Sequence, residues 1–486
     1  MKAITALLSS GLTLFSLLMA TQPDTSGNGT SHDSYPDSVV DFENDLIPVF
    51  TKSGCNAGGC HGAAIGRGGL QLSLFGGNPR KDYQNIVHEL GGRRVNIARP
   101  DESLIFTKPT GIVSHGGKQV LEENEEGADL IKRWIEQGAR FATKHKLQSV
   151  EITPRVQAFQ TVGSSASLKA TAHYTDGSQR DVTRWTVFEA EDSASVTIDE
   201  HAAKVTVTRR GRHIVVARYL GWVIPTELFV PLGDDAVDLS TQPRNSFIDE
   251  EILRTLGNLR VLPSPMADDA TFHRRVTLDL AGRLPSPQEV DAYVASTDAD
   301  KRERLIDRLL ASEAFVESWA MRLGRLLRLR SQYDKNKITI TPTTVRTYHG
   351  WITDQLRKGT GYNQIARALL TATGNSEAVG PAGFYNTAED ALLQTEFMTE
   401  VFLGSRMRCA NCHNHPLDKW TQDDFHGLAA IFAKVTRGTT VRVSPLGKTV
   451  HPQTGQPAQM RIPGVRFLPT DTKDGRTALA EWVTSV

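Results

Sequence analysis

The placement of the four cysteines is the feature that most limits how this chain can fold and function. They form two close pairs, and a histidine directly follows the second cysteine of each pair. The two groups are Cys55, Cys60 and His61, and Cys409, Cys412 and His413. Disulfide frameworks are not usually laid out in this way. The pattern instead favours two sites at which thiols and an imidazole act together.

The second group reads Cys-Ala-Asn-Cys-His over residues 409–413, which is the signature of c-type haem attachment. Two thiols three positions apart on a helical turn can reach both vinyl groups of one porphyrin, with the adjacent imidazole under the iron. The alternatives are a redox dithiol and a zinc site that recruits His415 or His426. The other axial ligand stays open between His426, His349, Met398 and Met407, although the two methionines are more typical of core packing.

The first group has four residues between its cysteines instead of two. Gly58 and Gly59 can adopt positive φ, and we expect them to let the longer loop fold back so that both sulfurs meet one porphyrin, with His61 as axial ligand. The alternative is a disulfide that closes a small loop. An opening helix before Cys55 and an amphipathic helix near residue 130 are the parts with which a small cytochrome encloses a haem, so the sequence predicts haem c here.

A ligand for the opposite face of this haem must come from another histidine. No methionine occurs between Met19 and Met266, so the usual thioether is missing. His115 lies on a loop just before the closing helix, where a distal ligand would be presented, and His88 is the weaker candidate. Two imidazoles would leave no open position and would favour electron transfer over ligand chemistry.

The start of the chain predicts export. Lys2 precedes a mostly apolar stretch that ends at Ala20, so residues 1–20 read as a cleaved signal peptide and residues 21–42 as a disordered linker. The alternative is an uncleaved anchor helix, and this would be the protein's contact with a membrane. The predicted location is the periplasm or the cell surface.

The rest of the chain divides by its hydrophobic pattern. The predicted class is multidomain α and β: a small all-α, cytochrome c-like haem domain, a β-sandwich, and a mainly α-helical domain that contains the second motif. A loop-rich region rich in Pro, Gly and Thr follows and reads as the start of a further, truncated part. The expected bounds are residues 43–143, 147–233, 245–434 and 435–486.

The chain also resembles the planctomycete-type multidomain cytochrome c proteins. The resemblance rests on residues 54–62, 72–76, 174–178 with 181–183, 278–285 and 409–416. It implies a haem domain, a bacterial immunoglobulin-like domain and two domains of unknown function, with covalent haem at the first motif and, less directly, at the second. Such proteins continue well past a segment like residues 479–483, so we expect this chain to be truncated at its C-terminus.

Charge limits the function further. Lys plus Arg and Asp plus Glu both number 55, so no net field draws the chain to nucleic acid. The first hypothesis is an exported cytochrome, with one haem c or two, that exchanges electrons with a redox partner protein. The second is a surface scaffold that binds polysaccharide or protein through the sandwich. An oxidase or peroxidase would need an open position on the iron, and no catalytic residue is predicted.

Overall fold

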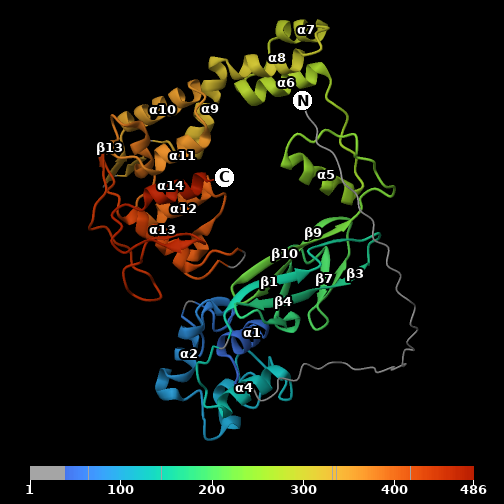
Figure 1. Cartoon of the computed structure of the whole chain (residues 1–486), viewed down its shortest axis with the longest axis vertical. Helices are drawn as coiled ribbons and strands as arrows, with labels where there is room; N and C mark the ends of the chain where they lie inside the picture. The colour runs from blue at the N-terminus through green and yellow to red at the C-terminus, as the bar shows by residue number, and fades with distance from the viewer. Residues whose placement is uncertain are drawn as a thin grey trace, which may run out of the picture. The chain divides into compact units, whose positions relative to one another are not determined.

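A computed structural model describes residues 39–63, 65–143, 145–330, 332–334, 337–415 and 418–485 (Figure 1). The predicted signal peptide 1–20 and most of the predicted linker lie outside these residues. Helices and β-sheets both contribute to the fold, and the C-terminal region is helical. No helix within the described ranges has the length and apolar character that a membrane span requires.

The first region is built from short helices joined by long loops. Asp41 begins it by accepting hydrogen bonds from the backbone N–H groups of Glu43 and Asn44, both at 2.9 Å. The folded chain therefore includes Val40 and Asp41, which are buried. The helices and helical turns are η1 (Phe42–Leu46), α1 (Ile47–Lys52), η2 (Leu74–Gly76), α2 (Pro79–Val87), η3 (Glu89–Gly92), η4 (Pro100–Glu102), α3 (Leu104–Thr107) and α4 (Glu126–Glu136).

Helix α4 is the predicted closing helix, and its apolar stripe is confirmed. Leu130, Ile131, Trp134 and Ile135 are all buried. The ring centroid of Trp134 lies 5.4 Å from that of Phe42 in η1, so the closing helix packs on the opening one. Burying four large apolar side chains in this way stabilises the region by several kcal/mol, at roughly 1.5–3 kcal/mol each.

The second region consists of short strands. They are β1 (Leu147–Thr153), β2 (Val156–Ala158), β3 (Ser165–Ser167), β4 (Lys169–Tyr174), β5 (Gln179–Asp181), β6 (Val187–Ala190), β7 (Val196–Asp199), β8 (Lys204–Val207), β9 (Gly211–Tyr219) and β10 (Trp222–Val230), with the helical turn η5 (Thr183–Trp185) before β6. They form three sheets, in the orders β1-β4-β5, β2-β10-β9-β6 and β3-β8-β7. Alternating residues such as Ile152, Ala170, Val205 and Val215 are buried in a core that is continuous with that of the first region.

The third region is helical, and side-chain caps define several of its helix starts. Ser246, Ser286 and Thr421 each form a capping box with the acidic residue three positions later. The elements are α5 (Phe247–Leu259), α6 (Asp269–Ala281), α7 (Pro287–Ala295), α8 (Lys301–Leu310), α9 (Glu313–Leu326), β11 (Gln332–Asp334), β12 (Lys337–Ile340), α10 (Pro342–Arg357), α11 (Tyr362–Leu370), β13 (Gly374–Asn375), η6 (Gly380–Asn386), α12 (Ala391–Phe402), η7 (Met407–Asn411) and α13 (Gln422–Ala433).

The helical core continues past the predicted boundary at residue 434. Leu479 and Ala480 are fully buried and belong to the same core as Ile431 and Phe432 of α13. The buried Arg476 side chain donates a hydrogen bond to the Ala372 carbonyl at 2.8 Å, which ties the last helix to the loop after α11. The elements of this segment are β14 (Thr440–Val441), β15 (Arg461–Ile462), β16 (Arg466–Phe467) and α14 (Arg476–Thr484).

Candidate cofactor site

The first region encloses a cavity of about 310 Å³ next to the first cysteine and histidine group. Both thiols, Cys55 and Cys60, line it. His61 and the predicted distal residue His115 line it as well. Residues that lie up to 60 positions apart in the sequence are therefore brought to one site. His88 does not line the cavity and caps the end of α2 on the exposed surface.

The backbone of the cysteine loop is fixed by hydrogen bonds that begin at the end of α1. The N–H of Cys55 donates to the Phe50 carbonyl at 2.8 Å, and that of His61 donates to the Cys55 carbonyl at 3.0 Å. The Leu72 N–H then donates to the His61 carbonyl at 2.8 Å. These bonds fold the longer loop back on itself and hold His61 against the segment that contains Leu72.

The glycines that permit this loop are not the predicted ones. Gly58 and Gly59 do not have positive φ, so that expectation was wrong, and Gly54 (φ 73°) takes the left-handed conformation just before Cys55. At Gly62, a Cβ atom would lie 2.0 Å from the Asn56 carbonyl oxygen. The loop needs glycine at the place where its two ends approach each other, and the sequence pattern alone does not show where that is.

His61 and His115 form a pair of nearly parallel rings. Their ring centroids are 6.0 Å apart and their planes differ by 8°. A metal-bound imidazole nitrogen lies about 2.0–2.1 Å from its ion, so two imidazoles on opposite sides of one ion have ring centroids about 6 Å apart. The spacing of the pair therefore matches that of two axial ligands.

Hydrogen bonds orient both rings. The Nδ1 atom of His61 lies 3.0 Å from the Arg67 carbonyl oxygen and 3.1 Å from that of Leu70. The Nδ1 atom of His115 lies 3.0 Å from the Lys118 carbonyl oxygen. A carbonyl can only accept, so Nδ1 carries the proton and Nε2 keeps its lone pair, which is the usual arrangement for metal-ligating histidine. Burial lowers the pKa of His61 and keeps the ring neutral.

The lining of the cavity is apolar in its depth and cationic elsewhere. The buried apolar residues that line it are Phe50, Leu72, Ile105, Pro109, Leu121 and Ile131. The cationic ones are Arg67, Arg93, Arg94 and Lys108, and no carboxylate is among the described lining residues. Such a lining suits a ligand with a large apolar body and anionic groups. The sequence reasoning missed these cations because they lie on loops without periodicity.

The two cysteines of the cavity are separate thiols. Neither is in a disulfide. Burial, with a smaller effect from Cys60, raises the pKa of Cys55 to about 12. Cys55 is therefore a neutral thiol at physiological pH, because the thiolate is disfavoured in an apolar environment.

The buried carboxyl of Asp82 stabilises the segment against which the cysteine loop is held. Asp82 in α2 is almost fully buried and accepts hydrogen bonds from the Ser73 backbone N–H at 2.5 Å and hydroxyl at 2.6 Å. Ser73 directly follows Leu72, whose N–H is bonded to His61. Burial raises the pKa of Asp82 to about 7, against the two hydrogen bonds that lower it.

The second group of cysteines and histidine has a different setting. Cys409 lies in η7 and Cys412 ends it, and both cysteines are exposed. The Nδ1 atom of His413 lies 2.8 Å from the carbonyl oxygen of the neighbouring Asn414. None of the three residues lines the cavity described above. No cluster of three metal-ligating side chains is present among the residues that the structure describes.

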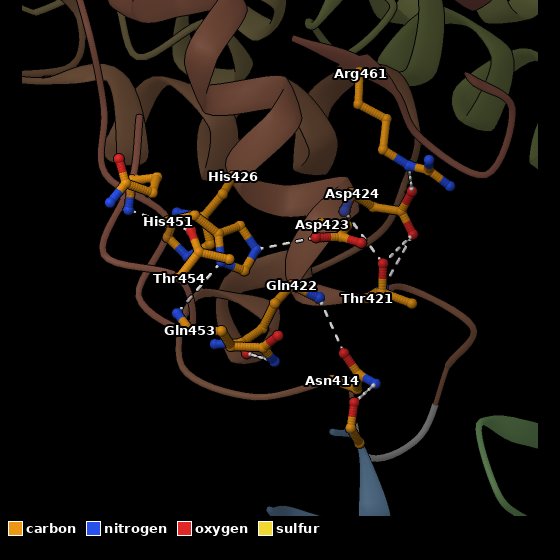
Figure 2. A network of polar contacts seen from close by, with 12 residues as sticks. Asn414, Thr421, Gln422, Asp423, Asp424, His426, His451, Gln453, Thr454 and Arg461 are labelled. Atoms are coloured by element: carbon orange, nitrogen blue, oxygen red, sulfur yellow. Dashed lines mark hydrogen bonds and ion pairs between the residues drawn. The ribbon is translucent and has the colours of Figure 1, made fainter. Parts of the chain in front are cut away.

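The first turn of α13 holds this second loop in place (Figure 2). His426 Nε2 donates to the Asn411 carbonyl at 2.9 Å, and the Gln422 N–H donates to the Asn414 side chain at 3.0 Å. His451 Nε2 lies 3.1 Å from Asp423 and its ring is 5.1 Å from that of His426. His426, a candidate ligand from the sequence, thus bonds the backbone. His451 was missed because it lies in a loop 25 residues away.

Comparison with known families identifies one part of the chain. Residues 247–437 match the family described as PSCyt2, a protein of unknown function (DUF1549). The matched segment begins with α5, ends just after α13 and includes the second motif. This region is therefore a planctomycete-type domain of unknown function, and the match does not extend to the cavity of the first region. No curated protein matches the chain.

Proposed function

We propose that the first region is a c-type cytochrome unit with one covalent haem, and that the protein transfers electrons through it. The observation that carries the proposal is the cavity in which two thiols and two facing imidazoles meet. When bound, haem supplies a one-electron Fe(III)/Fe(II) couple. The signal-like segment at residues 1–20 supports an exported location, in the periplasm or at the cell surface.

Each residue of the site has a separate role in this proposal. Cys55 and Cys60 form thioether bonds by adding their S–H groups across the two vinyl groups. His61 is the proximal ligand, as in other sequences in which histidine follows the second cysteine. His115 is the distal ligand. The carbonyls that accept the Nδ1 protons hold both rings in the ligating tautomer and raise their basicity.

The lining supports the same cofactor. The apolar lining residues would exclude water from a bound porphyrin, and the cationic side chains would compensate its propionates. Ligation by two imidazoles gives a lower potential than Met/His ligation and leaves no open position for substrate. The geometry thus supports electron transfer better than oxidase or peroxidase chemistry. Haem at the second motif remains a prediction from the sequence.

Haem content of the full chain tests the proposal. The protein is expressed with a c-type maturation system, denatured, and measured by pyridine haemochrome absorbance per chain. We expect one covalent haem, lost in Cys55→Ala and Cys60→Ala together, and retained in the matched control Cys409→Ala. A chain without covalent haem in a competent host would overturn the proposal. Two haems would extend it to the second motif.

A further inference from the structure

The rim of the cavity is exposed and carries positive charge. We define the cavity rim as the exposed lining residues Arg67, Gly68, Leu90, Arg93, Gly116 and Gly117. Lys118 follows the last of them and is also exposed. Arg67, Arg93 and Lys118 form no ion pair with any described residue. Glu89, beside Leu90, is already within 3.9 Å of both Lys81 and Arg94.

These charges exceed what the cofactor itself would neutralise. Four cationic side chains line the cavity, namely Arg67, Arg93, Arg94 and Lys108, and no acidic one is found among the described lining residues. Arg94 is buried and ion-paired with Glu89, which leaves three, and two propionates would compensate two of these. With the haem of the proposed function in place, the surface around its exposed edge therefore stays positive, and Lys118 adds to it.

The chain segments that line the cavity also carry exposed apolar side chains. They are Ile65 (94% exposed), Leu90 (61%), Ile112 (52%), Val113 (39%) and Val120 (37%). Each lies on the rim or within three residues of a cavity-lining residue in the sequence. Single exposed apolar residues are common on protein surfaces, but several of them on the chain segments that line one cavity are typical of an interaction site.

We infer that the cavity rim docks an electron-carrier protein whose contact face is acidic around an apolar centre. The inference rests on the proposed function. In the complex the partner's cofactor loses one electron and the ferric iron gains it. The rim residues lie on turns and loops, whereas proteins that bind anionic membranes through apolar residues generally use an amphipathic helix. The chain as a whole has zero net charge, so the positive rim is a local feature. It favours a partner with an acidic patch of similar size.

Binding to a flavodoxin, an acidic electron carrier, tests the inference. Haem content is first measured on every variant. Isothermal titration calorimetry then uses the ferric full chain and oxidised flavodoxin, because no electron can pass between these two states. We expect Kd to rise about tenfold or more between about 10 mM and 300 mM salt, since exposed charges are screened over this range.

Charge reversal and apolar truncation separate the two parts of the surface. Arg93→Glu and Lys118→Glu should each weaken binding about tenfold at low salt, because like charges across an interface are unfavourable. Leu90→Ser should weaken binding without changing its salt dependence. Lys204→Glu, on the exposed side of β8, is the matched control and should leave Kd unchanged.

The outcomes distinguish the two proposals. Absence of covalent haem would contradict the proposed function, whereas haem-loaded protein that does not bind flavodoxin would overturn only the docking surface. Binding that Arg93→Glu and Lys118→Glu leave intact would overturn it as well. Binding of vesicles of phosphatidylserine and phosphatidylcholine through the same residues, without binding of flavodoxin, would also overturn the docking surface. That result would assign the rim to a membrane.

Discussion

The two cysteine and histidine groups look alike in sequence and differ in their surroundings. At the first, Cys55, Cys60 and His61 line a cavity. The ring centroid of His115, which also lines it, lies 6.0 Å from that of His61. At the second, Cys409 and Cys412 are exposed, and the buried His426 donates a hydrogen bond to the backbone of the loop itself. The second group has the standard spacing for haem attachment, yet the residues that line a cavity are those of the first.

This difference shows that a cysteine and histidine motif and the pocket around it are separate requirements of a cofactor site. A short motif places thiols and a ligand on one turn, but a cofactor pocket also needs an apolar floor and a group on the opposite face. Segments 50 to 80 residues away supply these at the first site, where Leu121 and Ile131 line the floor and His115 lies opposite. The predictions below change one feature at a time to test this contrast.

Removing the proximal ligands should give the largest contrast. We expect His61→Ala to abolish the low-spin haem spectrum of the full chain, because His115 is the one other histidine among the described residues that line the cavity. His413→Ala should leave the spectrum and the haem content unchanged. Visible absorption and electron paramagnetic resonance spectra of the ferric protein check both variants. Loss of signal in His413→Ala instead would show that the second motif carries the haem.

The distal ligand should be separable from the proximal one. His115→Ala should keep the covalent haem but open one axial position, so that the ferrous protein binds carbon monoxide and the ferric protein becomes high-spin. His115→Met should raise the midpoint potential, because a thioether stabilises the reduced iron. His88→Ala is the control, and it should behave as wild type. Carbon monoxide binding by the wild-type protein would contradict ligation by His115.

The glycine at the closure of the first loop should matter more than the glycines inside it. Gly62→Ala places a Cβ atom 2.0 Å from the Asn56 carbonyl oxygen, whereas a Cβ at Gly59 meets nothing within 4 Å. We expect Gly62→Ala to destabilise the first region by about 3 kcal/mol or more, as overpacking against rigid backbone does. Gly59→Ala should have little effect. Hydrogen exchange of peptides from residues 50–75 compares the two variants.

Part of this site could be predicted from the local sequence. The rest could not, for physical reasons. The amphipathic stripe of α4 and the position of His115 before it follow from periodicity and order along the chain, so both could be expected. The need for glycine at Gly62, the support of the loop by Asp82 and the cationic lining arise from contacts between loops. Such contacts have no period in the sequence, so only the folded chain shows them.

Asp82 makes the first site sensitive to pH in a way that the second is not expected to share. Burial raises its folded-state pKa to about 7 from the ordinary aspartate value of 3.8. Between these values the folded state binds the proton more tightly than the unfolded state, so the contribution of Asp82 to stability is largest below about pH 4 and falls as pH rises to 7. The fall is a few kcal/mol. Asp82→Asn should remove this slope.

Hydrogen exchange of peptides from residues 70–88, corrected for intrinsic rates, measures the local opening free energy between pH 4 and 8. Peptides from residues 405–415 serve as the internal control and should show no matching slope. A wild-type slope of the opposite sign would contradict a raised pKa, and an unchanged slope in Asp82→Asn would assign the effect to another group.

The smallest effect concerns His426, and it tests whether the second motif contains a ligand or only a structural histidine. His426→Ala removes the 2.9 Å hydrogen bond to the Asn411 carbonyl, while Gln422 still donates to that carbonyl at 3.4 Å. The expected cost is about 1 kcal/mol, the usual value for one neutral hydrogen bond, seen as faster exchange in residues 405–415. His349→Ala, on the exposed side of α10, is the control.

Because the haem of the proposed function is held at the first motif, its spectrum and stoichiometry should not change in His426→Ala. A spectral change in His426→Ala would instead make this residue an axial ligand and place haem at the second motif.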